Sequence, residues 1–121
     1  MYAGNSLISL NKWSEAKEFF EKASGASSKV ITQGGIAGLG ACLEHDGKYT
    51  EAAEKYEAAS KLSVDENLQS RYNFYSGLCF EKAGNKIKAE ELYRSILKSS
   101  QVTEFSMLAK AGLIRIGTII E

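Results

Sequence analysis

The chain contains no proline, one histidine, one tryptophan and two cysteines among its 121 residues. Without proline, its helices can end only at glycines and at local polar residues. Fifteen Lys and Arg residues balance fifteen Asp and Glu residues, so no net charge indicates nucleic acid or an anionic membrane surface as a partner. No apolar run approaches the roughly 18 to 20 residues of a membrane-spanning helix, and the first residues lack the pattern of a signal peptide.

Residues that commonly serve in catalysis or metal binding are few and isolated. His45 is the single histidine, and no second His or Cys lies at the spacing of a metal ligand. It stands at the end of a predicted helix, where a positive charge is favourable. The stretch 34–40 is rich in glycine but lacks the Gly-Lys-Ser/Thr ending of a phosphate-binding loop, and no strand precedes it. We therefore expect no catalytic residue, no metal and no cofactor.

The two cysteines occupy equivalent positions in successive segments of the chain. Cys42 and Cys79 lie 37 residues apart, each on a predicted helix. Helices that stack side by side are about 8 to 10 Å apart, which exceeds the Cα separation that a disulfide tolerates. Both thiols are expected to be reduced, buried and separate.

The dominant feature of the sequence is an internal repeat of 36 to 37 residues. Residues 40–44 (Gly-Ala-Cys-Leu-Glu) recur as residues 77–81 (Gly-Leu-Cys-Phe-Glu), and the register extends back to Gly4, 36 residues before Gly40. A period of this length is typical of one helical hairpin per repeat, stacked so that each hairpin covers the apolar face of its neighbour. Stacked hairpins usually present a curved surface to a partner and seldom catalyse reactions.

The spacing of apolar residues predicts helices throughout. Trp13, Ala16, Phe20 and Ala23 fall on one stripe at intervals of three and four. No segment alternates with period two for long enough to indicate a strand. Seven helices are expected, the first of them before residue 11. The other six cover about 11–23, 29–45, 49–62, 66–83, 87–99 and 102 to the end of the chain.

These residues resemble the tetratricopeptide repeat. In that family the first helix has a large apolar residue, a Leu-Gly pair and then Leu or an aromatic residue, while the second has Tyr, Ala, an aromatic residue and Ala. The resemblance covers residues 1 to about 98, although the usual proline between repeats is missing and the repeats exceed the family's length of about 34 residues. The central repeat matches at Ile36, Leu39, Gly40, Leu43, Gly47, Tyr49, Ala52, Tyr56 and Ala59.

The resemblance implies an all-α fold, an α-solenoid of antiparallel helical hairpins with about three tetratricopeptide-like repeats plus a terminal helix. The chain 1–121 would form a single domain, with repeats at about 1–28, 29–64 and 65–101 and the terminal helix at 102–121. The chain opens inside a first helix, and its last helix has apolar residues around its circumference. We therefore expect both ends to continue in a longer array, and these apolar ends would also allow the domain to associate with itself.

The glycines of the stretch 34–40 have an energetic cost. Each glycine inside a helix costs about 0.5 to 1 kcal/mol relative to alanine, and the repeat motif accounts only for Gly40. Two interpretations remain open. The small residues Gly34, Ala37, Gly38 and Ala41 could leave a stretch of backbone accessible to a partner segment, or a neighbouring helix could pack there unusually tightly.

In the tetratricopeptide family, fixed positions of the first helices line a concave groove. Phe74 is expected to be an aromatic anchor there, and Arg71 a donor to a carboxylate or carbonyl. Of the five positions with which chaperone-binding members clamp a terminal carboxylate, only Asn5 and Arg71 match, which argues against a chaperone tail as the ligand. Transferred residue by residue, the expected partner-binding set is Asn5, Ala37, Ala41, Glu44, Arg71, Phe74, Leu78 and Glu81.

The function implied by the resemblance is a non-catalytic protein–protein interaction scaffold that binds a protein or peptide segment in this groove. Bacterial members that act as envelope or assembly factors have similar repeats. The alternative is a regulatory interaction domain of a larger enzyme or signalling protein. Neither nucleic acid nor direct membrane insertion is expected. The sequence leaves the partner, the compartment and the oligomeric state open.

Overall fold

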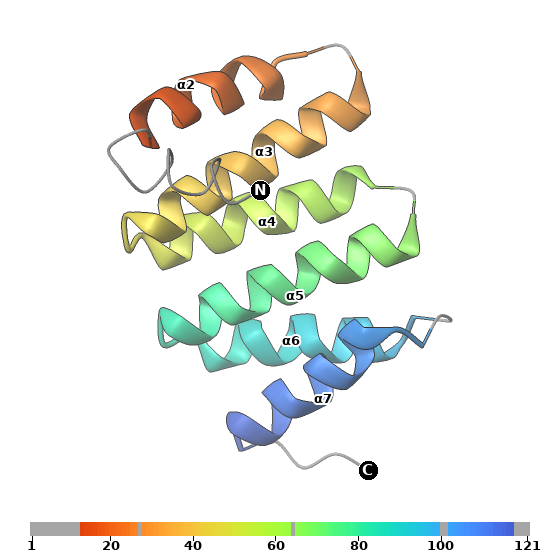
Figure 1. Cartoon of the computed structure of the whole chain (residues 1–121). Helices are drawn as coiled ribbons and strands as arrows, with labels where there is room; N and C mark the ends of the chain where they lie inside the picture. The colour runs from red at the N-terminus through yellow and green to blue at the C-terminus, as the bar shows by residue number, and fades with distance from the viewer. Residues whose placement is uncertain (1–12, 27, 64, 100–101, 118–121) are drawn as a thin grey trace.

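The computed structural model describes residues 13–26, 28–63, 65–99 and 102–117, and every regular element in these ranges is an α-helix. The helices stack in chain order from one end of the molecule to the other (Figure 1). The predicted all-α fold is therefore confirmed, while the helix expected before residue 11 lies outside the described residues. The helices are α2 (Trp13–Ser24), α3 (Lys29–His45), α4 (Tyr49–Leu62), α5 (Glu66–Lys82), α6 (Lys86–Leu97) and α7 (Glu104–Arg115).

The helix boundaries follow from local chemistry. Asp65 caps α5 by accepting a hydrogen bond from the backbone N–H of Asn67 at 2.9 Å. The tight turns within the hairpins place Gly47 and Gly84 at φ of +78° and +86°, a backbone conformation that favours glycine. The prediction that the last helix continues to the end of the chain is wrong, because α7 ends at Arg115 and Gly117 has a φ of +85°.

The six helices form two rows. The first helices of the hairpins (α3, α5 and α7) make one row, and the second helices (α2, α4 and α6) make the other. Ion pairs join α3 to α5, α5 to α7, and α4 to α6. They are Lys82–Glu44 at 3.4 Å and Arg115–Glu81 at 2.6 Å in the first row, and Lys88–Glu57 at 3.9 Å in the second.

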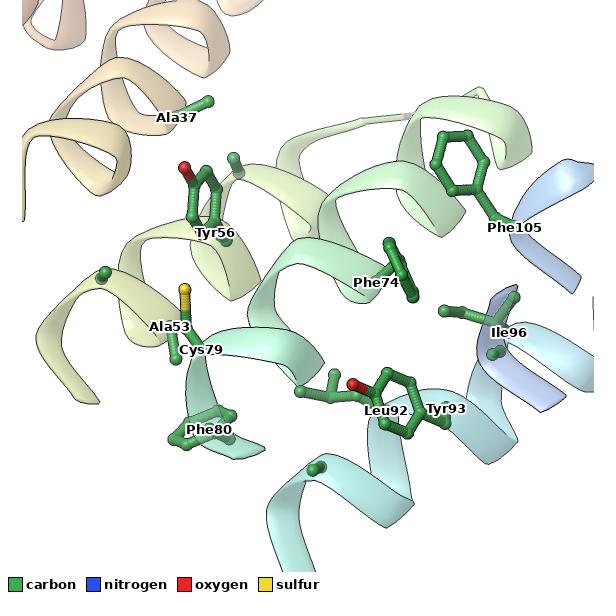
Figure 2. Close-up of a cluster of buried hydrophobic side chains, with 14 of the residues drawn as sticks. Ala37, Ala53, Tyr56, Phe74, Cys79, Phe80, Leu92, Tyr93, Ile96 and Phe105 are labelled. Carbon is green, nitrogen blue, oxygen red and sulfur yellow. The ribbon is translucent and has the colours of Figure 1, made fainter. Parts of the chain in front are cut away.

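The core lies between the two rows and is built from small residues facing large ones (Figure 2). Tyr93 is fully buried, and its ring is clamped between Gly77 of its own hairpin and Gly112 of α7. A Cβ atom at either glycine would lie 2.6 Å from the ring, on opposite edges. The two glycines therefore allow α5, α6 and α7 to close around one aromatic side chain.

The two cysteines are buried and free, as predicted. Burial raises the pKa of the Cys42 thiol. Burial, with the nearby Glu44 carboxylate adding to it, raises the pKa of the Cys79 thiol to about 12. A buried thiol that stays protonated is a poor nucleophile and a poor metal ligand, so both residues act as small packing groups. No helix in the described part of the chain is long and apolar enough to cross a membrane.

Candidate functional site

Helix α5 lies in the middle of the first-helix row and shows one stripe to solvent. Its exposed residues are Asn67, Tyr75 and Lys82, and the half-buried Arg71 and Leu78 fall between them at helical spacing. Because α4 and α6 pack on its other faces and α7 lies beside it, this stripe is the surface that α5 can offer to a partner.

The internal repeat identifies the matching stripes on α3 and α7. Tyr75 corresponds to Gly38, 37 residues earlier, and to Gly112, 37 residues later. We call the surface formed by the three stripes the α3–α5–α7 face. At the equivalent positions of the flanking helices, Gly38 packs against Phe20 and Gly112 against Tyr93, whereas Tyr75 packs against Tyr56 and keeps part of its ring at the surface. The α3 stripe comprises Val30, Gly34, Gly38, Ala41 and His45. On α7 the exposed residues of the stripe are Glu104, Leu108 and Arg115, whereas Gly112 is buried against the Tyr93 ring.

Tyr75 joins a set of aromatic rings that extends from the core to the surface. Its ring is perpendicular to that of Phe105 at a centroid distance of 6.5 Å, and it meets Tyr56 at 5.6 Å in an edge arrangement. These are favourable aromatic geometries. Tyr75 is 37% exposed, so part of its ring reaches solvent while the rest packs against these neighbours.

Arg71 stands one turn before Tyr75 on the same stripe. Its guanidinium carbon lies 6.0 Å from the centroid of the Phe105 ring, within the range of a cation–π contact. Within the described residues it makes no ion pair. Arg71 is therefore the cation of the α3–α5–α7 face whose charge is not already matched by a carboxylate of the fold.

Glu44 and Glu81 occupy equivalent positions and hold equivalent partners. Each accepts a hydrogen bond from the tyrosine hydroxyl of its own hairpin, at 3.2 Å from Tyr56 and 2.8 Å from Tyr93. Each also receives a cation from the following first helix. The Arg115 guanidinium donates two hydrogen bonds to the Glu81 carboxylate, at 2.6 and 2.9 Å. These two predicted partner-binding residues therefore already link neighbouring hairpins.

Two of the expected binding residues are not on the surface. Phe74 is only 8% exposed, and its ring packs 6.0 Å from both Tyr93 and Phe105 (Figure 2). The expectation that it is an aromatic anchor for a partner is wrong, because its ring points toward α6 and α7. Ala37 is 9% exposed and belongs to the same core cluster. Tyr75 was missed, although comparing equivalent positions along the repeat singles it out.

The remaining expected residues are divided over the face. Arg71 and Leu78 lie on the α5 stripe, whereas Ala41 and Glu44 lie on α3 and line a shallow cleft of about 400 Å³ at one end of the face. His45, Tyr49 and Lys82 complete its walls. Asn5 lies outside the described residues.

The structure distinguishes the two interpretations of the glycine stretch position by position. At Gly38 a Cβ atom would collide with the Phe20 ring of α2, and at Gly35 it would come within 2.7 Å of the backbone carbon of Ala23. Tight helix packing therefore accounts for these two glycines. At Gly34 no atom lies within 4 Å of the Cβ position, so only Gly34 leaves room above the backbone.

The link at Glu81 leads to a prediction about pH. Hydrogen bonds from Arg115, and secondarily from Tyr93, lower the pKa of Glu81 despite its partial burial. A lowered folded-state pKa adds stability above the unfolded value of about 4.3 and loses it as the pH falls through the folded value. Glu81→Gln should therefore destabilise the fold by about 1 kcal/mol at pH 7 and by progressively less in acid.

Urea denaturation of Glu81→Gln and of the natural chain from pH 7 to pH 3 measures this effect. Glu90→Gln is the matched control, because Glu90 is paired with Arg94 on the surface of a single helix and should change stability by less than about 0.5 kcal/mol. A destabilisation by Glu81→Gln that is the same at every pH would contradict the assignment.

Comparisons of this chain with protein-family models, with curated proteins and with solved structures each find no match. The relationships that guide interpretation are therefore those among its own repeats. Within the described residues, no group of three or more His, Cys, Asp or Glu side chains is placed to hold a metal ion.

Proposed function

We propose that the chain is a non-catalytic interaction domain of the tetratricopeptide type that binds a protein or peptide segment on its α3–α5–α7 face. The observation that supports this most is Tyr75. It is a partly exposed aromatic residue in the middle helix of this face, and its ring contacts the rings of Tyr56 and Phe105.

The chemistry of the face suits recognition of a chain segment. Tyrosine and arginine are enriched among the residues that contribute most to binding energy at protein interfaces. Tyr75 would supply apolar area, and Arg71 would donate hydrogen bonds to a carboxylate or a backbone carbonyl. Gly34 and Ala41 on α3 are low enough for a partner backbone to approach beside them.

The alternative function uses the same face in another setting. In a regulatory domain of a larger enzyme or signalling protein, the bound segment would belong to the same polypeptide and would control its activity. In the scaffold role, which includes bacterial envelope or assembly factors, the segment would belong to a separate protein. The residues that contact the segment would be the same in both cases.

Selection from a random peptide library displayed on phage tests the proposed surface. Peptides enriched on the natural domain should bind Tyr75→Ala at least about tenfold more weakly, because the substitution removes the exposed ring from the centre of the face. Isothermal titration of the best peptide gives the affinities. Lys61→Ala, a change at an exposed residue of α4, is the control and should bind as the natural domain does.

Two results would count against the proposal. One is that the selected peptides bind Tyr75→Ala and Lys61→Ala equally well. The other is that no peptide is enriched beyond the level seen with an unrelated helical protein. Circular dichroism melting of both variants must show that the fold is retained.

A further inference from the structure

A separate cleft lies on the second-helix side of the stack, away from the α3–α5–α7 face. It has a volume of about 420 Å³ and lies between α2 and α4, with the apolar residues Leu39 and Leu43 of α3 at its floor. Charged side chains of both signs form its walls. These are Lys17 and Glu21 from α2, and Glu51, Glu54 and Lys55 from α4, with Ala58 beside them.

We call the junction between two neighbouring second helices a seam, so the cleft lies in the seam between α2 and α4. In the next seam, between α4 and α6, lies a lysine side chain of the protein itself. The Nζ atom of Lys88 lies 3.9 Å from a carboxylate oxygen of Glu57 and 3.8 Å from one of Glu91. The same ammonium lies 5.6 Å from the centroid of the Phe80 ring. In this seam an ammonium group therefore lies near two carboxylates and above an aromatic ring.

The repeat shows what differs in the first seam. Glu51 corresponds to Lys88, Glu21 to Glu57 and Glu54 to Glu91, at offsets of 36 or 37 residues. The two acidic partners are therefore kept, whereas the lysine that they hold is replaced by a third carboxylate. The floor is kept as well, because Leu43 corresponds to Phe80.

The charges of the open cleft are unbalanced and unpaired. Three carboxylates face two ammonium groups, and none of the five makes an ion pair within the described part of the chain. Leu39 is buried and Leu43 half-buried, so the floor can cover a hydrocarbon stem. Lysine side chains commonly lay their methylene groups along apolar surface while the ammonium group stays at the polar rim.

We propose that this cleft binds a lysine side chain of a protein partner. Its methylene groups would lie over Leu39 and Leu43, and its ammonium group would be held by the carboxylates of Glu21, Glu51 and Glu54. The arrangement would repeat in trans the contacts that Lys88 makes in cis one hairpin further along the stack. It adds a second contact point, on the other row of helices, to the face proposed above.

Blocked amino acids test this proposal directly. The probes are Nα-acetyl-lysine N-methylamide and its norleucine counterpart, which has the same stem without the ammonium group. Each is titrated into methyl-labelled protein, and the NMR signals of Leu43 and Ala58 are followed. The lysine probe should shift these signals saturably, and the norleucine probe should bind at least about tenfold more weakly because the charge-assisted contacts are missing.

Variants of the cleft complete the test. Glu51→Lys places a lysine at the position equivalent to Lys88, so it should abolish the response to the lysine probe and melt at or above the natural temperature. Glu21→Gln, on a different helix, should weaken the response several-fold. Tyr75→Ala should leave it unchanged, which separates this site from the α3–α5–α7 face.

The proposal is overturned if the norleucine probe binds as well as the lysine probe, if neither probe binds, or if the Glu51→Lys variant responds as the natural chain does. Tighter binding of the arginine counterpart would also overturn the assignment to lysine.

Discussion

Replacing Phe74 with alanine should lower the free energy of unfolding by about 3 to 5 kcal/mol, whereas replacing the adjacent Tyr75 should lower it by about 1 kcal/mol. Phe74 packs between Tyr93 and Phe105, where α5, α6 and α7 meet. Its loss leaves a cavity that three helices must close together, so relaxation is limited. Tyr75 is 37% exposed, and water replaces much of what its removal vacates.

Chemical denaturation of the two variants measures the difference. The pair controls for helix propensity, because both substitutions place alanine at successive positions of the same helix. Similar unfolding midpoints for the two variants would mean that the assignment of Phe74 to the core and of Tyr75 to the surface is wrong. In that case Tyr75 would also lose its place at the centre of the proposed binding face.

The helices themselves could be predicted from the sequence because their signals are local and repeated. Helices α3 and α4 begin and end at the residues that the pattern predicts, since glycine and polar turn residues bound each apolar stripe. The end of α7 was missed. Its apolar residues continue past Arg115, but the backbone of Gly117 adopts a conformation that stops the helix, and composition alone does not show this.

The binding face was predicted less accurately because it depends on how α5 is rotated in the stack. Successive helical residues point about 100° apart, so an error of one position exchanges a surface residue for a core residue. That is the difference between Phe74 and Tyr75. The sequence pattern identifies α5 as a first helix, but the direction of each ring is decided by contacts with Phe105 on a helix about thirty residues away.

The surroundings of the helical glycines also depend on contacts between helices that are distant in the sequence. Gly34, Gly38 and Gly77 all lie inside helices, and the repeat marks only Gly77, the equivalent of Gly40, as a packing position. In the fold, Gly34 faces open space, Gly38 lies under the Phe20 ring of α2, and Gly77 lies against Tyr93 of α6. Gly34 and Gly38 are distinguished only by the packing of neighbouring helices, and this packing gives a glycine-to-alanine substitution opposite expected effects at different positions.

Gly77→Ala should destabilise the domain by about 1 to 3 kcal/mol, because the new methyl group would lie 2.6 Å from the fully buried Tyr93 ring, which could shift only toward Gly112. Gly34→Ala should stabilise it by about 0.5 to 1 kcal/mol, because alanine favours the helix and nothing occupies the space around the new methyl group. Thermal and urea denaturation of the two variants should therefore move in opposite directions.

The clamp around Tyr93 adds a test of coupling. Gly112→Ala presses on the opposite edge of the same ring, so in Gly77→Ala/Gly112→Ala the ring cannot relieve one contact by shifting toward the other. The double variant should therefore lose more stability than the sum of the single losses, by at least about 0.5 kcal/mol. Additive losses would show that α5 and α7 adjust independently, and the close contact of three helices around one tyrosine would then not be what holds the last hairpin to the stack.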